Sequence, residues 1–387
     1  MSSPMDAVIV DAVRTPIGRA HPQRGWYRNV RADELAATCI RALIERTGID
    51  PAQIEDVVLG CTQQTGEQGL NVARIVALLA GLPVSVAGTT VNRLCGSSLQ
   101  ALNQAAHSIA ANAEEIVVVG GLEHMQHLPM GHAIDVNPKL FHRTSPAALK
   151  MGLTAEHLAR KFGISRPEQD AFAHSSHQKA ASAESAGDFA SQLVPVFGHD
   201  ERGKRLLVEK DQSVRADSSL ESLAALQPVF LSGGTVTAGN SSPTSDGAAA
   251  MLVVSRRKAQ ELGLKPLAKV RSSAVVGVSP SEMGLGPVGA TEKALRRAGL
   301  TLADIDLVEI NEAFAAQTIA CSRLLRLDEA KLNVCGGAIA IGHPLGASGA
   351  RIATTLVHAM VARDAQFGLA TMCIGLGQGI ATILERV

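Results

Sequence analysis

Hydrophobic and polar positions along the first part of the chain predict helices and strands that follow one another in turn. Apolar residues recur at helical spacing in ELAATCIRALIERTG (34–48) and LQALNQAAHSIA (99–110). Unbroken apolar runs, typical of buried strands, occupy EDVVLGCT (55–62) and EEIVVVGG (114–121). Because strands joined through helices usually lie parallel, this order predicts parallel sheets covered by helices on both faces.

The same order of elements returns in the second part of the chain. Helices are predicted at ATEKALRRAG (290–299) and GARIATTLVHAMV (349–361). Strands are predicted at IDLVEINEA (305–313) and FGLATMCIG (367–375). The pattern therefore predicts a duplicated unit.

A constant offset relates the two copies. The segment RTGIDPAQIEDVV (46–58) aligns with RAGLTLADIDLV (297–308), and each position pairs with the one 251 residues later. The same offset places NRLCGSS on HPLGASG without a gap, so that Cys95 coincides with Gly346. Chance similarity rarely keeps register over such a length. We therefore predict an α/β fold of two related halves, layered as an α/β/α/β/α sandwich.

The two halves are expected to flank a segment of different character. We predict an N-terminal half at 1–120, a loop-rich domain at 121–249 and a C-terminal half at 250–387. The middle segment contains polar, irregular stretches such as GGLEHMQHLPMGHAIDVNP and GHDERGKRLLVEKD. Because loops on a rigid scaffold often carry binding residues, we expect substrate contacts there.

Composition and charge exclude several classes of protein. The chain has 387 residues, 46% of them hydrophobic, and its 36 Lys and Arg balance 36 Asp and Glu. It is long enough for a large core, and no overall charge favours nucleic acid or an anionic membrane. No apolar run reaches the length of a membrane span and no signal peptide is recognisable, so we expect a cytoplasmic protein without an integral membrane segment. The six cysteines include no CxxC pair, so we expect no metal site and no disulfide framework.

Cys95 lies where an apolar segment gives way to a helix of small residues, in TTVNRLCGSSLQ. A free cysteine is commonly a buried packing residue. At a helix N-terminus, however, the helix dipole and unpaired N–H groups favour the thiolate. With an imidazole nearby, they could supply the roughly 1.5 pKa units that half-ionise a thiol at pH 7.

His343 lies in CGGAIAIGHPLGASGARI, where the glycines and Pro344 predict a tight turn before a helix. A loop histidine is often only a structural hydrogen-bond partner. The repeat changes this interpretation, because helix starts related by a pseudo-twofold axis tend to meet at that axis. We therefore expect His343 to lie close to Cys95.

Two further motifs could complete a site. Cys373 precedes GLGQG, whose glycines allow close approach of a ligand and leave bare N–H donors for an oxyanion. The alternative is a glycine-rich hairpin with a buried cysteine. Asn311, in VEINEAFAAQ, falls where a strand ends and would hold a water or a substrate carbonyl, or simply cap the next helix.

Together CGSS, NEAFA, GHPLGASGAR and CIGLGQG, in this order and spacing, resemble the thiolase superfamily over the whole chain. The segments GEQGLNVAR, GGLEHM and MGLTAE and the GLGQG variant are most similar to the bacterial 3-ketoacyl-CoA branch that forms the β-subunit of the fatty-acid oxidation complex. Biosynthetic acetoacetyl-CoA thiolases usually have GGG in place of GLG. The resemblance implies a duplicated, five-layered thiolase-type α/β/α/β/α sandwich with an inserted loop domain, and an acyltransferase of fatty-acid β-oxidation. It also implies that CoA is a substrate and that there is no resident cofactor.

The resemblance implies a role for each candidate residue. His343 would take the proton of Cys95, whose sulfur attacks the 3-keto carbonyl of a 3-oxoacyl-CoA, and Cys373 would protonate the departing acetyl-CoA carbanion. Cys373 would then deprotonate CoA, which lifts the shortened acyl group from Cys95 in a ping-pong reaction. One oxyanion site would combine His343 with a water held by Asn311, and the other the backbone N–H groups of Cys95 and Gly375.

Contacts with CoA are implied in the same way. Residues expected around the adenine and pantetheine, or along the pantetheine tunnel, are Arg215, Ser222, Leu226, Phe230, Ala238, Ser242, Met151, Ala313 and Phe314. Lys150 departs from the family pattern, which has histidine in some members and methionine in the most similar ones. The role of position 150 therefore stays open, although a lysine suits the phosphates of CoA.

Other functions are compatible with parts of this sequence pattern. A ketoacyl synthase shares the fold and the nucleophile position but generally has histidine or asparagine where this chain has Cys373. An acetoacetyl-CoA thiolase is the alternative within the family, and a non-catalytic acyl-CoA-binding or scaffold protein is the alternative outside enzymes. A homodimer or tetramer is expected, with an enoyl-CoA hydratase/3-hydroxyacyl-CoA dehydrogenase α-subunit as a possible partner.

Overall fold

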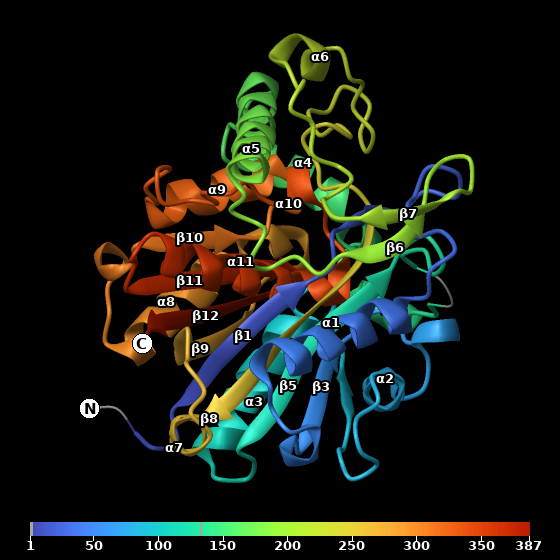
Figure 1. Ribbon diagram of the computed structural model, residues 1–387. Coiled ribbons are helices and arrows are strands. Elements are labelled where there is room, and N and C mark those ends of the chain that lie inside the picture. Colours follow the sequence, from blue (N-terminus) through green and yellow to red (C-terminus); the bar gives the residue numbers. More distant parts are fainter. Residues whose placement is uncertain (1–2, 132–133) are drawn as a thin grey trace.

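The computed structural model describes residues 3–131 and 134–387 (Figure 1). The first part of the chain forms β1 (Ala7–Arg14), β2 (Gly18–Arg19), α1 (Ala32–Thr47), β3 (Asp56–Gly60), α2 (Val72–Leu79), β4 (Thr89–Val91), α3 (Ser97–Ala110) and β5 (Ile116–His124). The middle part forms α4 (Met151–Lys161), α5 (Arg166–Ala186), β6 (Val196–His199), β7 (Arg205–Val208) and α6 (Leu220–Ala224). The last part forms β8 (Ser245–Ser255), α7 (Arg256–Glu261), β9 (Ala268–Gly277), α8 (Gly286–Ala298), β10 (Leu307–Ile310), α9 (Ala315–Leu325), α10 (Ala338–Ile341), α11 (Ser348–Ala362), β11 (Phe367–Ile374) and β12 (Gln378–Arg386).

The predicted repeat is confirmed by the order of the strands. The main sheet runs β10-β11-β12-β9-β1-β8-β5-β3-β4. At its centre β9 and β1 meet through only two residue pairs, Val8 with Lys269 and Ile9 with Ala268. Read outward from this junction, β1-β8-β5-β3 and β9-β12-β11-β10 match strand for strand. The starts of β3 and β10, of β5 and β11, and of α3 and α11 all keep the offset of 251 residues.

The helices and the two half-sheets form the five predicted layers. Helices α3 and α11 pack together in one core with the inner faces of both half-sheets (Figure 1). Helices α1 and α2 cover the outer face of the N-terminal half-sheet, and α8 covers that of the C-terminal half-sheet. Along β5, Val117 belongs to the inner core and Val118 to the outer one, as the alternation of side chains in a strand requires.

The prediction of parallel sheets is only partly correct. Strand β3 is parallel to β4 and β5, and β10 is parallel to β11. The remaining neighbours in this order, β5–β8, β8–β1, β1–β9, β9–β12 and β12–β11, are antiparallel. Strand β12 follows β11 directly through a short hairpin, and strands joined in this way must run in opposite directions. The sheet is therefore mixed.

The segment between β5 and β8 contains more regular structure than the loop-rich character predicted for it. Helices α4 and α5 have 11 and 21 residues and pack against α9 and α10 of the C-terminal half (Figure 1). Residues 132–133 of the predicted loop-rich stretch lie outside the described residues. Within the described ranges, no helix is both long and apolar enough to cross a membrane.

Candidate active site

Cys95 lies in a tight turn between β4 and α3. Leu94 has a φ of 46°, a left-handed conformation that is uncommon for a residue other than glycine. The Ser97 hydroxyl stabilises this turn: its oxygen accepts from the Arg93 N–H at 2.9 Å, and it donates to the Leu94 carbonyl at 2.5 Å. The turn places Cys95 one residue before Gly96, the N-cap of α3, so the predicted position at a helix start is confirmed.

Burial controls the ionisation of the Cys95 thiol. Its pKa is raised to about 11, chiefly by loss of hydration and to a smaller extent by the charge of Glu123. Backbone hydrogen bonds from Gly375 and from Cys95 itself lower the pKa, but by less than burial raises it. The prediction that the helix end and an imidazole together could half-ionise this thiol at pH 7 is therefore wrong for the resting protein. The thiol stays protonated until a base removes its proton.

His343 lies between α10 and α11 in a loop that fixes the ring on both sides. Gly342 has a φ of 121°, and the His343 N–H donates to Ser245 Oγ at 3.1 Å. The ring Nδ1 lies 2.6 Å from Ser348 Oγ. Burial, with a contribution from the charge of Arg351, lowers the pKa of His343 to about 3. The ring is therefore neutral at pH 7, and with Nδ1–H donating to Ser348 its Nε2 is free to accept a proton.

Asn311 lies next to this free nitrogen. It follows β10 directly, is fully buried, and places its Nδ2 3.4 Å from His343 Nε2. Its Oδ1 has no hydrogen-bond partner in the described part of the chain. Helix α9 is capped at Phe314 and not at Asn311, so the interpretation of Asn311 as a helix cap is wrong. The amide instead faces the site with an unused acceptor, which suits a bound water or substrate oxygen.

Cys373 lies near the end of β11, and Gly375 follows that strand in the hairpin to β12. Burial raises the pKa of Cys373 well above its usual value, and a thiolate on the nearby Cys95 would raise it further. A Cβ added at Gly375 would lie 3.3 Å from Leu94 and 3.5 Å from the sulfur of Met151. The hairpin thus touches the turn of Cys95 on one side and α4 on the other.

An apolar wall leads from this hairpin toward the surface. Cys373 shares a buried cluster with Ala313 and Phe314, and Met151 packs against the cluster. The Phe230 ring meets Phe314 edge-on at 5.9 Å and is itself 42% exposed. Three of the residues predicted for a pantetheine tunnel therefore lie together beside Cys373, with Phe230 at the outer end.

The other predicted CoA contacts lie at different depths. Both the N–H and the Oγ of Ser242 donate to the Ala313 carbonyl at 3.1 Å, so Ser242 belongs to the wall. Leu226 lies against Gly239, where an added Cβ would come within 2.5 Å of it, and the neighbouring Ala238 is exposed.

Arg215 and Ser222 lie farther out. Both are exposed; the Arg215 N–H donates to His177 of α5, and Ser222 takes part in the capping box at the start of α6. The structure does not bring these two side chains into the buried cluster. Lys150 precedes the first residue of α4 and is exposed beside the wall.

Sequence reasoning missed two side chains that fix His343. Ser348 contacts the ring and Ser245 contacts the backbone of the loop. Ser348 was visible in GHPLGASGAR, five residues after the histidine, but was interpreted only as part of a helix start.

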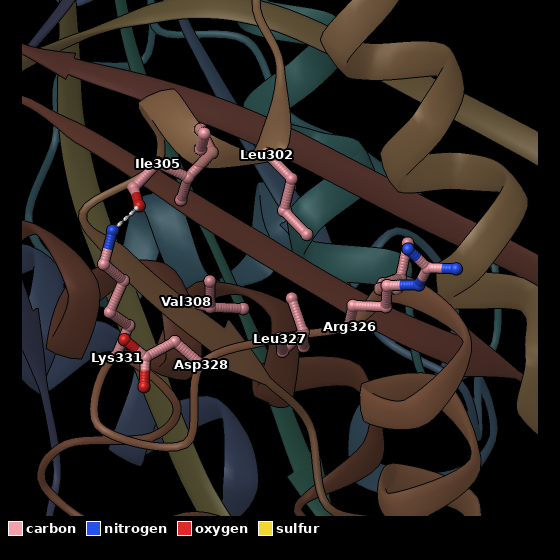
Figure 2. Close-up of a pocket in the computed structure, with 9 residues that line it drawn as sticks. Leu302, Ile305, Val308, Arg326, Leu327, Asp328 and Lys331 are labelled. Atoms are coloured by element: carbon pink, nitrogen blue, oxygen red, sulfur yellow. Dashed lines mark hydrogen bonds between the residues drawn. The ribbon is translucent and has the colours of Figure 1, made fainter.

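A surface groove of about 350 Å³ is unrelated to this site. Figure 2 shows its lining around Leu302, Val308 and Leu327, with Lys331 Nζ donating to the Ile305 carbonyl at 2.8 Å. The groove lies at the start of β10, whereas Asn311 follows the end of that strand. It therefore lies at the opposite end of β10 from Asn311.

One cluster has the residue types of a metal site but not the geometry. Potential ligand atoms of Glu67, His124 and His127 lie within 4.8 Å of one another. The two imidazoles are stacked at 3.7 Å with an angle of 8° between their planes. A metal ion lies close to the plane of each imidazole that binds it, and two parallel rings do not share such a position. The His127 ring instead hydrogen-bonds Glu67 at 3.0 Å and the Arg28 carbonyl at 2.8 Å.

Comparisons with known proteins agree along the whole chain. The family model described as thiolase, N-terminal domain, matches residues 7–257, and that described as thiolase, C-terminal domain, matches residues 264–386. The chain is 54% identical to a 3-ketoacyl-CoA thiolase of Marinomonas sp., covering 100% of this chain and 99% of that protein. It is 56% identical to one of Erwinia tasmaniensis, covering 98% and 99%. The crystal structure of the acetyl-CoA acetyltransferase of Bacillus anthracis superposes with a TM-score of 0.90 at 39% identity, covering 99% of each chain.

Proposed function

The chain belongs to the thiolase family, and from this premise we infer that it cleaves 3-oxoacyl-CoA with CoA to give acetyl-CoA and a shortened acyl-CoA. The observation that carries this conclusion is the pairing of Cys373 with the nearby Cys95 beside an apolar wall, with the Asn311 amide of the same site next to His343. The full-length similarity to proteins named 3-ketoacyl-CoA thiolase supports the same reaction.

The first half-reaction uses the neutral pair of Cys95 and His343. Nε2 of His343 accepts the thiol proton while Sγ of Cys95 attacks the 3-keto carbon. The bond between C2 and C3 then breaks, and its electron pair stays on C2 as the enolate of acetyl-CoA. The Cys373 thiol gives its proton to C2, acetyl-CoA leaves, and an acyl thioester remains on Cys95. The raised pKa of Cys373 keeps that proton available until the carbanion forms.

The second half-reaction reverses the proton transfers. The Cys373 thiolate takes the proton of the CoA thiol, and the CoA sulfur attacks the acyl carbonyl on Cys95. The backbone N–H groups of Cys95 and Gly375 face the developing oxyanion. When the tetrahedral intermediate collapses, the Cys95 thiolate leaves and is protonated by His343, which completes a ping-pong cycle. CoA acts as a co-substrate, and these steps require no resident cofactor.

Thiolysis over a series of 3-oxoacyl-CoA substrates tests this function. The apolar wall from Cys373 to the exposed Phe230 suits a pantetheine arm and an extended acyl chain. We expect activity on medium or long chains in addition to acetoacetyl-CoA. Activity on acetoacetyl-CoA alone would favour the reaction named for the Bacillus anthracis relative. Absence of thiolysis with all chain lengths would contradict the proposal.

We propose further that the protein acts as a dimer or tetramer in bacterial fatty-acid β-oxidation, in the cytoplasm. Strand β4 ends the sheet, and the large apolar side chains Leu70 and Val84 nearby are 89% and 82% exposed. An open edge strand with exposed apolar neighbours suits pairing with a second copy. Light scattering tests the oligomer. Co-purification with a hydratase/dehydrogenase α-subunit from the native host tests the larger complex.

A further inference from the structure

The carboxylate of Glu123 lies at the centre of a buried hydrogen-bond network. Glu123 is in β5 and is fully buried. Its Oε2 accepts from the Thr62 N–H at 3.0 Å, the Thr62 hydroxyl at 2.5 Å and the Gly346 N–H at 2.9 Å. Its Oε1 accepts from the Gln63 N–H at 3.2 Å and from Gln68 Nε2 at 2.7 Å. Five donors converge on one side chain that contacts neither catalytic sulfur directly.

One side of the network ends at the turn that carries Cys95. The Asn92 amide donates from Nδ2 to the Thr62 carbonyl at 3.1 Å and accepts at Oδ1 from the Leu94 N–H at 2.9 Å. Leu94 is the residue with left-handed backbone immediately before the nucleophile. Glu123 therefore reaches the Cys95 turn through Thr62 and Asn92.

The other side ends in the loop that carries His343. Gly346 lies three residues after His343, and its N–H is held by Glu123. An added Cβ at Gly346 would lie 2.8 Å from the Leu122 carbonyl and 2.9 Å from Glu123 Oε2, so the backbone is pressed against the end of β5. The loop thus cannot shift outward without breaking this contact.

The repeat gives this contact a counterpart in the site. Gly346 corresponds to Cys95, and Asn92 corresponds to His343, across the offset of 251 residues. In the second copy the Gly346 N–H binds the internal carboxylate of Glu123. In the first copy the equivalent N–H of Cys95 is directed at its own sulfur and, in the proposed reaction, at an oxyanion. The Glu123 carboxylate thus binds the Gly346 N–H in the second copy, as the substrate oxyanion would bind the Cys95 N–H in the first copy.

We propose that Glu123 is a positioning residue for thiolysis, which fixes the Cys95 turn relative to the His343 loop through Thr62, Asn92 and Gly346. The proposal rests on the function inferred above. Proton transfer between a thiol and an imidazole requires close contact, and a displacement of about 1 Å can cost a factor of about 100 in rate. A rigid link between two loops of different halves supplies that alignment.

A carboxylate is the group that this position requires. All five groups that contact the carboxylate are hydrogen-bond donors. A glutamine at position 123 would turn its NH₂ group toward at least one N–H group, and two of the present hydrogen bonds would be lost. Glu123 does not activate the Cys95 thiol electrostatically, because its negative charge raises the pKa of Cys95. Removing that charge alone would make the thiol more acidic and its attack easier. A loss of rate on neutralisation therefore reports lost geometry.

The test compares Glu123→Gln with Asp306→Asn in the full chain. Asp306 Oδ2 accepts hydrogen bonds from the Gln366 and Phe367 N–H groups at 2.8 and 2.9 Å. These groups lie at the start of β11, whereas Cys373 lies near the end of that strand. Both variants lose a structural carboxylate. We expect Glu123→Gln to lower kcat for thiolysis about 100-fold with KM for both substrates within threefold of wild type, and Asp306→Asn to keep kcat. An equal kcat for Glu123→Gln and wild type, or an equal loss in Asp306→Asn, would overturn the proposal.

A second variant covers the case in which Glu123→Gln does not fold. Asn92 is exposed, so Asn92→Ala removes the link to Leu94 without opening the core. We expect it to keep the wild-type unfolding temperature and lower kcat at least tenfold, with KM unchanged. An unchanged kcat for Asn92→Ala would overturn the proposal. Failure of the inferred function is distinguishable, because the wild-type protein itself would then show no thiolysis.

Discussion

At the scale of single residues, burial decides the chemistry of the site more than local helix structure does. Position at a helix N-terminus and the motif around Cys95 were readable from the sequence. The loss of water around the sulfur depends on β11, β12 and α4, which are distant from Cys95 in the sequence. The raised pKa of the thiol could therefore not be predicted from the sequence. The same packing keeps His343 neutral. The reactants are thus a thiol and a neutral imidazole, not an ion pair.

This conclusion predicts the pH dependence of the first half-reaction. The pKa of His343 is lowered to about 3 and that of Cys95 is raised to about 11, so both keep their protonation states between these values. The plot of kcat/KM for the 3-oxoacyl-CoA should therefore show no break near 6.5, where an ordinary histidine titrates. Steady-state rates between pH 5.5 and 9 check this. A tenfold fall per pH unit below about 6.5 would contradict a neutral resting pair.

A second prediction concerns the serine that fixes the imidazole. Ser348→Ala removes the oxygen 2.6 Å from Nδ1 and with it the preference for the tautomer whose Nε2 is free. We expect kcat to fall about tenfold while KM for CoA stays within twofold. Ser273→Ala is a matched control, because Ser273 Oγ lies 3.1 Å from His107 Nε2 away from the site. Equal kcat values in the two variants would show that Ser348 does not prepare the base.

At the scale of elements, sequence periodicity and the repeat predicted most of the scaffold. The four helices and four strands predicted in the two copies are present, and the glycines that end α1 and α8, Gly48 and Gly299, have φ values of 65° and 69°. The antiparallel strands β8 and β12 were not predicted. Nothing in an apolar run gives its direction, and β8 pairs with β1 and β5 only after the long middle segment. Long-range pairing of this kind is set by the assembled core.

The close contact of α3 and α11 gives a prediction for stability. A Cβ at Gly349 would lie 2.3 Å from the Leu99 backbone nitrogen, so Gly349→Ala forces the central helices apart. We expect a loss of about 2 kcal/mol in the free energy of unfolding, measured by urea titration. Gly289→Ala, in α8, meets only Val276 at 3.5 Å and should stabilise by about 0.5–1 kcal/mol because alanine favours helices. Equal effects of the two changes would contradict the packing described here.

At the scale of the whole molecule, the five-layered core buries groups that must stay uncharged. All six cysteines have raised pKa values because burial disfavours the thiolate, with Cys39 and Cys321 at about 12 and Cys335 at about 11. Composition alone indicated that these thiols are not in disulfides or metal motifs. It could not show which of them lie at a reactive surface, because that depends on how the halves meet.

This burial predicts loss of stability in alkali. The unfolded chain ionises its thiols from about pH 8.5, whereas the folded chain cannot until much higher pH. The free energy of unfolding is therefore highest below pH 8.5 and falls as the pH rises toward 11. Calorimetry under reducing conditions should show a declining unfolding temperature from pH 8.5 to 10.5. Cys39→Ala should show a shallower decline, and an identical slope in this variant and wild type would contradict the assignment to buried thiols.

The most direct test of the central claim is intact-mass analysis after incubation with a 3-oxoacyl-CoA in the absence of CoA. The mechanism predicts one shortened acyl group per chain, located on Cys95 by peptide mapping, with one equivalent of acetyl-CoA released. The adduct should disappear on addition of CoA and be absent from Cys95→Ser. Acetyl-CoA release without an adduct, or an adduct on another cysteine, would contradict an acyl-Cys95 intermediate.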